Sequence, residues 1–205
     1  MKKVGIMGGT FNPIHNGHLM LAQKALEQFA LEEVLFMPCG VPYMKADQKV
    51  EDGQIRAEMT ALAIEGQPKF TLSVMELEQT GNTYTYQTLE RLKKAHPDTE
   101  YYFIVGADSL FHMPKWAHPE KIFADCRILA AVRDDKTTDD MKEQIRFLEQ
   151  QYDAKIHLLQ TEYMDISSSE IRRKAAAGES IEGEVPEPVR TYIERNGLYR
   201  SQQEF

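Results

Sequence analysis

The sequence has few of the residues that mark secreted, metal-binding or membrane proteins. Its two cysteines, Cys39 and Cys126, lie far apart and match neither a disulfide framework nor the spacing of a metal site. No run approaches the ~20 apolar residues of a membrane span. The apolar run at 4–7 breaks at Gly8 and Gly9, which is not the pattern of a signal peptide. We therefore expect a cytoplasmic protein with reduced thiols, no protein-held metal and no membrane partner.

Positive charge is also in short supply. Lysine and arginine number 24 against 32 aspartates and glutamates, which gives a net charge of −8. Non-specific nucleic-acid binding needs a basic surface that neutralises phosphates, so this balance disfavours a nucleic-acid partner. A phosphate-handling site in such a chain would have to gather its cations and helix N-termini locally.

What is present is typical of a soluble globular enzyme. Hydrophobic residues make up 42% and charged residues 27% of a chain of 205 residues, which is long enough for one domain with a sizeable core. The sequence has no linker, repeat or low-complexity tract. We expect one domain over residues 1–200 and a polar tail over 201–205. The sequence is silent on oligomeric state, so a homo-oligomer stays open.

Short apolar runs alternate with segments of helical periodicity. The runs typical of strands cover residues 3–7, 34–38, 70–77, 101–106, 128–132 and 155–159. Helical patterns run through 19–29, 55–63 and 145–152, and two further helices are expected around 168–177 and 188–196. This alternation predicts an α/β fold, a doubly wound and mostly parallel sheet with C-terminal helices. Ligands of such sheets bind at the carboxyl ends of strands, so motifs that directly follow strands are the candidates for chemistry.

The first such motif follows the first strand and opens a helix. It reads Gly8-Gly9-Thr10-Phe11-Asn12-Pro13-Ile14-His15-Asn16-Gly17-His18. Glycines allow a phosphate to approach the backbone closely, and a helix start offers free N–H groups and the positive end of a dipole. His15 and His18 are three residues apart, so both imidazoles can point to one side of the helix entrance. Gly17 leaves room between them for a bulky group such as a purine.

Other interpretations of this motif are weaker. No lysine follows the glycines as in a P-loop, and the glycine fingerprint of dinucleotide-dependent hydride transfer is missing. The two histidines could bind zinc, but no third cysteine, histidine or glutamate stands at metal-ligand spacing. A glycine-rich turn with two hydrogen-bonded histidines is the remaining structural alternative.

The second motif stands near the C-terminus and reads Ile166-Ser167-Ser168-Ser169-Glu170-Ile171-Arg172-Arg173. Ser167 and Glu170 have the spacing of a capping box that begins a helix. A cap does not account for three serines followed by two arginines. Hydroxyls and N–H groups at a helix start, with Arg172 one turn on, make an anion site with bidentate capacity.

Together these strings resemble the signature motifs of the nucleotidylyltransferase superfamily, G-x-F-x-P/D-x-H/T-x-G-H and I-S-S-T-x-I-R, with Ser169 in place of the commoner threonine. The first string is most similar to that of the nicotinate and nicotinamide mononucleotide adenylyltransferases, because the pantetheine-phosphate branch usually has threonine at the position of His15. The resemblance extends over essentially the whole chain, including Gly197-Leu198-Tyr199. It implies a Rossmann-like fold and transfer of AMP from ATP to nicotinate mononucleotide, giving nicotinate adenine dinucleotide and pyrophosphate in NAD biosynthesis.

The resemblance also implies roles for individual residues on the ATP side. ATP-binding residues would be Gly8, Gly9, Thr10, Phe11, His15, His18, Gly106, Asp108, Ile166, Ser167, Ser168 and Arg172. The catalytic candidates are His18 on the α-phosphate, His15 as an orienting group, and Lys45 and Arg172 as holders of phosphate charge. Mg²⁺ would arrive with ATP, because no acidic cage for a resident ion is apparent.

On the substrate side the resemblance points to Lys45, Tyr84, Thr85, Trp116 and Arg133. The segment that ends at Thr85 resembles the one that receives the nicotinate ring, and Trp116 would stack on the cationic pyridinium. Each residue has a structural alternative. Lys45 could be a solvated surface lysine, Thr85 and Asp108 could be helix caps, and Trp116 could be a core residue.

Two rival functions stay open at this point. A sister transferase would act on pantetheine phosphate, or with CTP on an alcohol phosphate, but Trp116 and the segment 83–85 argue against it. A nucleotide sensor without turnover would be expected to lose a catalytic histidine, and both are present. We also expect the acid mononucleotide to be preferred over the amide, because N–H groups at the helix start after residues 81–85 are donors only.

Overall fold

The structure, a computed structural model, describes residues 1–40, 50–133, 138–162 and 164–200, with the backbone alone for Arg133. Lys45 and the expected tail at 201–205 lie outside the described residues. The Arg133 side chain, predicted to contact substrate, lies outside them as well.

The centre of the fold is a six-stranded parallel sheet. Its strands are β1 (Lys2–Gly9), β2 (Glu33–Pro38), β3 (Phe70–Leu72), β4 (Thr99–Gly106), β5 (Cys126–Arg133) and β6 (Ile156–Thr161). They lie in the order β3-β2-β1-β4-β5-β6, so the chain winds outward from β1 to one edge and then returns beside β1 to wind toward the other. The predicted α/β class and doubly wound sheet are confirmed, and β1 and β4 flank the point where the order reverses.

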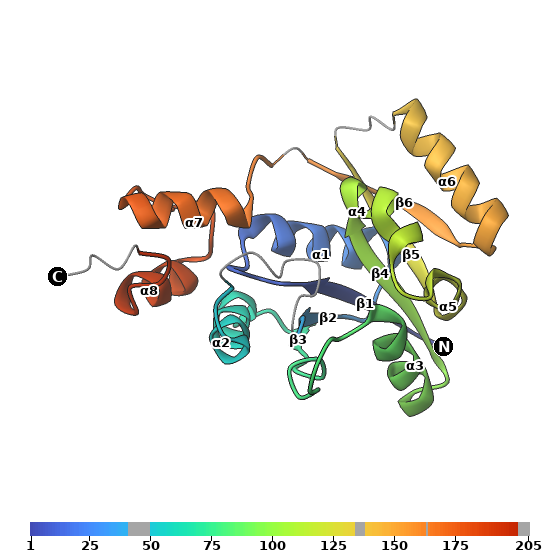
Figure 1. The fold of residues 1–205 in the computed structure, drawn as a ribbon, viewed down its shortest axis with the longest axis horizontal. Coiled ribbons are helices and arrows are strands. Elements are labelled where there is room, and N and C mark those ends of the chain that lie inside the picture. The colour runs from blue at the N-terminus through green and yellow to red at the C-terminus, as the bar shows by residue number, and fades with distance from the viewer. Residues whose placement is uncertain (41–49, 134–137, 163, 201–205) are drawn as a thin grey trace.

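Helices cover both faces of the sheet. The core on one face includes residues of α1 (Asn16–Phe29), α2 (Gly53–Ile64), α7 (Ser168–Ala177) and α8 (Glu187–Arg195). The core on the other face includes residues of α3 (Thr85–Ala95), α4 (Ala107–His112), α5 (Pro119–Asp125) and α6 (Asp139–Tyr152), with the 3-10 turn η2 (Met113–Lys115) between α4 and α5. Figure 1 shows α7 and α8 together beside α2, at the end of the molecule remote from α6.

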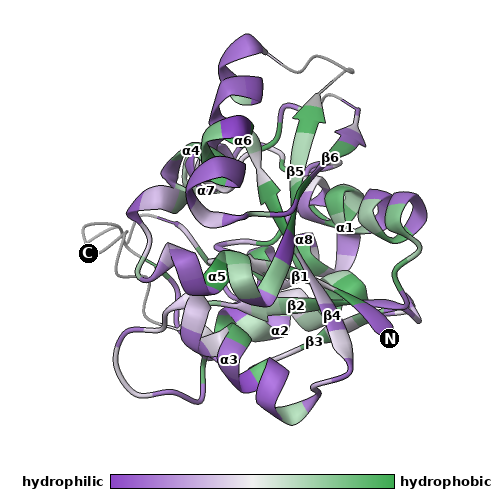
Figure 2. Cartoon of the chain, turned by 90° about the vertical axis from the view of Figure 1, so that its right-hand side faces the viewer, coloured by the Kyte–Doolittle hydropathy of each residue, from purple (hydrophilic) through white to green (hydrophobic). Residues whose placement is uncertain are grey.

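The apolar character of the strands follows from burial on both faces. In β4, Tyr102 and Ile104 join the core under α1 and α2, while Tyr101, Phe103 and Val105 join the core under α3 to α6. Successive side chains of a strand point to opposite faces, so a strand covered on both sides is apolar throughout. In Figure 2 the interior strands carry the green of hydrophobic residues, whereas much of the outer helices and loops is purple.

One predicted strand is wrong in its length. The run at 70–77 was expected to be a single strand, but β3 ends at Leu72. Ser73 still donates to the carbonyl of Phe36, after which Leu77 donates to the carbonyl of Val74 and closes a turn. β3 is an edge strand with one neighbour, so the sheet does not hold the chain straight beyond that point. The apolar side chains between Leu72 and Leu77 therefore belong to a turn and not to a strand.

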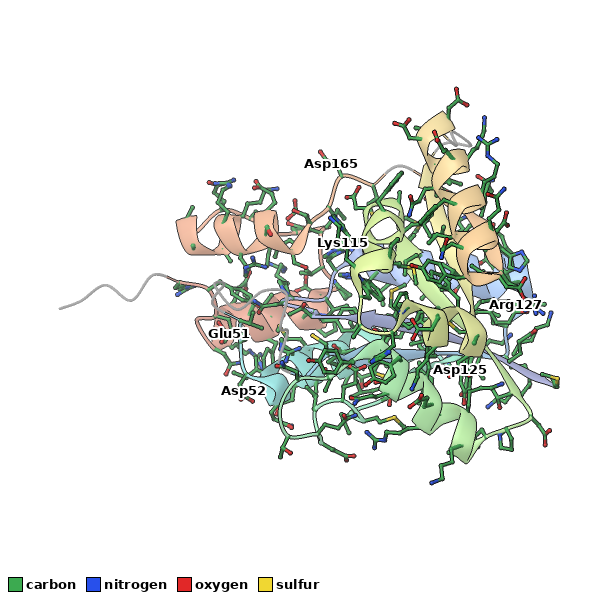
Figure 3. The ribbon with its side chains drawn as sticks, turned by 45° about the vertical axis from the view of Figure 1, so that its right-hand side comes forward. Glu51, Asp52, Lys115, Asp125, Arg127 and Asp165 are labelled. Carbon is green, nitrogen blue, oxygen red and sulfur yellow. The ribbon has the colours of Figure 1, made fainter. Side chains whose placement is uncertain are left out.

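Side-chain hydrogen bonds cap the starts of α2 and α6. Asp52 caps α2 by accepting from the N–H of Gln54 at 2.8 Å, and Figure 3 shows Glu51 and Asp52 at this end of α2, beside α8. Thr138 caps α6 by accepting from the N–H of Met141, and the first turn of that helix carries Asp139 and Asp140, which suit the positive end of the helix dipole. Within the described ranges no helix is both long and apolar enough to cross a bilayer.

Candidate active site

The candidate site is a cleft at the carboxyl ends of the strands. Its volume is about 1140 Å³, and it opens where β1 and β4 end and the strand order reverses. Pockets for drug-sized ligands hold roughly 300–1,000 Å³, so this cleft has room for more than one small ligand. Its walls include the starts of α1, α3, α4 and α7, and several positive helix ends therefore border one cleft.

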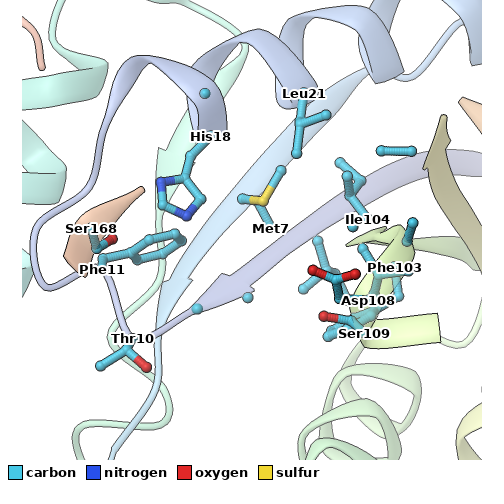
Figure 4. Close-up of a pocket in the computed structure, with 18 of the residues that line it drawn as sticks. Met7, Thr10, Phe11, His18, Leu21, Phe103, Ile104, Asp108, Ser109 and Ser168 are labelled. Carbon is cyan, nitrogen blue, oxygen red and sulfur yellow. The ribbon is translucent and has the colours of Figure 1, made fainter. Parts of the chain in front are cut away.

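The structure brings the predicted ATP-binding residues together. All of them line this cleft, although the two motifs are about 150 residues apart. Figure 4 shows His18 pointing from α1 toward Phe11, with Ser168 beside Phe11 and with Asp108 and Ser109 across the cleft. Of the substrate-binding candidates with described side chains, Thr85 and Trp116 line the cleft and Tyr84 does not.

The two histidines lie stacked at the entrance of α1. Their ring centroids are 3.7 Å apart, as the spacing of three residues allows. The backbone N–H of His15 donates to Nδ1 of His18 at 3.2 Å. An Nδ1 that accepts a hydrogen bond carries no proton, so the neutral His18 ring holds its proton on Nε2. His18 is therefore set up as a neutral hydrogen-bond donor.

His15 is buried, with only 8% of its surface exposed. Burial lowers the pKa of His15 to about 4, so the ring is neutral at pH 7. Its Nδ1 has no hydrogen-bond partner among the described residues. The stacked pair thus offers polar nitrogen atoms at the cleft without a full positive charge on His15.

Gly17 lines the cleft and packs against His15. A Cβ at this position would lie 3.0 Å from Nδ1 of His15, tighter than ordinary contact. This close contact favours glycine here. The room for a purine ring that the sequence suggested stays a prediction.

Distant residues hold the loop between β1 and α1. Arg172 of α7 donates to the carbonyl of Asn12 at 2.8 Å, and Ser168 donates to the carbonyl of Pro13 at 2.9 Å. The side-chain oxygen of Asn12 accepts from the Tyr199 hydroxyl at 3.0 Å. The second motif therefore positions the first motif, besides lining the same cleft.

Arg56 is a residue beside the cleft that the sequence patterns missed. It is 3% exposed and lies on α2, where its guanidinium donates to the carbonyls of Thr10 (2.7 Å), Glu51 (3.0 Å) and Gly40 (3.2 Å). A lone arginine on an amphipathic helix normally indicates a solvated position. No local pattern distinguishes an arginine that satisfies buried carbonyls, so only the folded arrangement reveals its role.

Arg172 and Arg173 differ in how their charges are compensated. Arg173 forms ion pairs with Glu170 at 2.8 Å and Glu179 at 2.9 Å. Arg172 donates to neutral acceptors, the Asn12 carbonyl and the Ser169 hydroxyl, and forms no ion pair within the described part of the chain. The uncompensated guanidinium lines the cleft, so it can attract an anion there.

The start of α7 has a side-chain cap and also places serine hydroxyls at the cleft. Ser167 caps it by accepting from the N–H of Glu170 at 3.2 Å. The Glu170 side chain does not return this bond but pairs with Arg173, so half of the predicted capping box forms. The serine hydroxyls and the helix dipole remain at the cleft edge beside Arg172.

The helix-cap alternatives for Thr85 and Asp108 are wrong. Tyr84 is the cap residue of α3, and it provides no side-chain cap, so Thr85 is the first helical residue. Gly106 occupies the cap position of α4, and Asp108 lies exposed in the first turn. The start of α3 thus presents backbone N–H groups without a side-chain cap next to a cleft-lining threonine.

Trp116 combines packing with exposure to the cleft. Its ring is half-buried and meets Phe103 edge to face, with centroids 6.1 Å apart at 86°. The indole N–H is buried and has no hydrogen-bond partner in the described residues. The core alternative is correct in part, because one side packs on the sheet while another lines the cleft.

The buried His15 predicts a pH dependence of stability. The ordinary pKa of histidine is 6.5, and burial lowers that of His15 to about 4. Between these values the unfolded chain binds a proton that the folded chain does not, so stability is fully present above pH 6.5 and falls as the pH drops toward 4. The full difference is about 3 kcal/mol.

We expect His15→Asn to remove this component. Urea unfolding at several pH values between 7 and 4 should give a shallower fall in the free energy of unfolding for the variant than for wild type. Equal slopes would show that His15 is protonated in the folded protein. Because other titrating groups are unchanged, the difference between the two curves isolates His15.

The chain is similar to known proteins over nearly its full length. The family model described as "Cytidylyltransferase-like" matches residues 6–174. The "Probable nicotinate-nucleotide adenylyltransferase" of Lachnoclostridium phytofermentans is 48% identical over 199 residues, covering 97% of this chain and 100% of the relative. The protein of the same description from Clostridium tetani is 38% identical over 200 residues, covering 98% and 100%.

A solved structure shares the fold. "Plasmodium falciparum nicotinic acid mononucleotide adenylyltransferase complexed with NaAD" matches with a TM-score of 0.78 and 23% identity, over 97% of this chain and 98% of that one. At this identity the likeness concerns the fold alone. The family follows from the sequence relatives, which match nearly the whole chain: the chain belongs to the nicotinate-nucleotide adenylyltransferase family.

Proposed function

We propose that this chain transfers AMP from ATP to nicotinate mononucleotide, giving nicotinate adenine dinucleotide and pyrophosphate as a step of NAD biosynthesis. The observation that carries the proposal is the composition of the single cleft. One part holds an uncompensated arginine, two stacked histidines and two helix starts, and another part holds Trp116 and the uncapped start of α3. The first set suits a triphosphate, and the second suits an aromatic ring with an anionic substituent.

In this proposal ATP lies along the loop after β1, with its phosphates toward Arg172 and the start of α7. Such an arrangement uses the only guanidinium that lines the cleft among the described side chains. Lys45 and Arg133, whose side chains lie outside the described residues, are proposed to add phosphate and substrate contacts. The pyridine mononucleotide lies toward Trp116 and Thr85, with Tyr84 proposed at the edge of that region.

The reaction needs positioning and charge stabilisation. An oxygen of the 5′-phosphate of nicotinate mononucleotide attacks the α-phosphorus in line, a new P–O bond forms, and the bond to the leaving pyrophosphate breaks. The attacking phosphate is already anionic, so no strong base and no covalent enzyme intermediate are required. His18 donates its Nε2 proton in a hydrogen bond to an α-phosphate oxygen, and its neutral state follows from the donor at Nδ1.

ATP is expected to enter with Mg²⁺. No group of three or more potential acidic, histidine or cysteine ligands comes together in the described residues. The arrangement suits an ion held by the phosphates and by water, because Mg²⁺ usually keeps several waters and takes few protein ligands. We therefore propose Mg²⁺–ATP as the substrate form and no resident metal. The absence of nucleic-acid and membrane partners and the cytoplasmic location stay predictions.

The role of His18 predicts a loss of turnover without a loss of fold. We expect His18→Ala to lower kcat by about 10²–10³, because a preorganised donor to the transition state contributes on that order. His96→Ala, at an exposed histidine after the end of α3, is the control and should keep wild-type kcat. Near-normal turnover by folded His18→Ala protein would remove His18 from the mechanism.

The contrast between the two arginines gives a matched pair of variants. Arg172→Lys keeps the charge but loses the fork that can contact the Asn12 carbonyl and a phosphate together, so KM for ATP should rise by about tenfold or more. Arg173→Lys, whose neighbours are glutamates, should leave KM for ATP unchanged within about twofold. Equal effects of the two substitutions on ATP kinetics would contradict a phosphate role for Arg172.

The substrate itself is tested by a panel of acceptors. Pyrophosphate release with ATP and Mg²⁺ should be fastest with nicotinate mononucleotide, slower by about ten- to a hundredfold in kcat/KM with nicotinamide mononucleotide, and absent with pantetheine phosphate. The N–H groups at the start of α3 match both oxygens of a carboxylate, whereas a carboxamide turns its own donors toward them. Equal rates for acid and amide would show that these donors do not select the substrate, and no release with either pyridine would refute the function.

A further inference from the structure

A series of part-buried contacts connects the phosphate side of the cleft to the pyridine side. It begins at the carbonyl of Thr10, which accepts from Arg56 at 2.7 Å. The same guanidinium donates to the carbonyl of Gly40 at 3.2 Å. Gly40 packs closely against the backbone of Glu76, whose carboxylate accepts from the Thr88 hydroxyl at 2.8 Å.

Glu76 contacts the start of α3. Its carboxylate accepts from the hydroxyl of Thr88, in the first turn, and Thr83, just before the cap residue, is close enough to act on its pKa. Burial raises the pKa of Glu76, while Thr88, Thr83 and Gly40 lower it, and burial is the larger effect. A part-buried carboxylate that accepts from a hydroxyl in the first turn of a helix is placed to orient that helix end.

Gly40 lies in the middle of this series of contacts, and close packing requires it to be glycine. A Cβ there would lie 2.7 Å from the carbonyl oxygen of Glu76 and 2.8 Å from Cγ2 of Thr83. Contacts under 3.0 Å force the backbone apart. The three segments that carry Thr10, Gly40 and Thr83 are thus locked at one spacing.

We propose that Arg56 and Glu76 are positioning residues that act through Gly40 to fix the loop after β1 and the start of α3 at one separation, so that both substrates are held at reacting distance. This inference rests on the proposed function, because the two ends of the series of contacts are where ATP and the pyridine mononucleotide are proposed to bind. In-line transfer needs reacting atoms about 3–3.5 Å apart, and a displacement of about 1 Å can cost about a hundredfold in rate. A rigid connection between the two half-sites meets that need.

The test is a double-mutant cycle with Glu76→Gln and Arg56→Lys. The glutamine replaces one accepting carboxylate oxygen by a donor and removes the charge, which weakens the bond from the Thr88 hydroxyl. The lysine keeps the charge of Arg56 but cannot reach three carbonyls in fixed directions. At saturating ATP and nicotinate mononucleotide, each variant should lower kcat by about tenfold, and the double variant should lose little more than either single variant, because both break one connection.

Two further measurements separate positioning from simple destabilisation. Glu78→Gln, an exposed neighbour two residues along, is the matched control and should keep wild-type kcat. Titration of the fluorescence of Trp116, the only tryptophan, with nicotinate mononucleotide should give a weaker Kd for Glu76→Gln than for Arg56→Lys, since Glu76 contacts the start of α3 directly. Losses in kcat that multiply in the double variant, or variants that change only the melting temperature, would overturn the proposal.

Amide hydrogen exchange provides a test that does not depend on turnover. Arg56→Lys should speed exchange of the amides at 85–88, at the far end of the series of contacts, by several-fold relative to the amides of β5. Unchanged exchange there would overturn the connection even in an active enzyme. A wild-type chain without activity on any pyridine mononucleotide, combined with faster exchange at 85–88, would refute the proposed function and leave the connection supported.

Discussion

The rest of the site depends on the hydrogen bonds that two arginines donate to the backbone of the loop after β1. Arg56 holds the carbonyl of Thr10 and Arg172 holds that of Asn12. Phe11 between them has φ of 50°, a left-handed conformation that costs a non-glycine residue roughly 1–2 kcal/mol. The loop does not adopt this shape from its own preferences. Residues that follow it by about 45 and 160 positions impose it, and so place His15 and His18 at the entrance of α1.

The same contacts explain how an acidic protein with a net charge of −8 can make a site for phosphates. Some surface arginines form ion pairs with acids, as Arg173 does with Glu170 and Arg190 with Glu187. The partners of Arg172 are a carbonyl and a hydroxyl, which leave its charge available at the cleft. Helix starts add partial positive charge at short range, where the distant acids are screened by water and salt. Local geometry therefore outweighs the overall charge.

The parts of the fold that the sequence predicted share a physical cause. Strands β1, β2, β4, β5 and β6 were predicted because burial on both faces makes a strand continuously apolar. β3 was predicted too long because an apolar turn and an apolar edge strand look alike in a sequence. The two motifs were recognised because hydroxyls, glycines and imidazoles at a helix start form a local pattern. Arg56 and Glu76 form none, since each bonds to groups that are distant in the sequence or lack a side-chain signature.

By itself the sequence determined the α/β class, the positions of both motifs and the chemistry they can support, because periodicity and local spacing are properties of neighbouring residues. Only the tertiary structure decided that Gly17 packs against His15, that Tyr84 rather than Thr85 is the cap residue of α3, and that Trp116 both packs and lines the cleft. It also decided which of two adjacent arginines keeps its charge free. These outcomes depend on which groups meet in space after folding, and burial and hydrogen-bond partners are set by the whole chain.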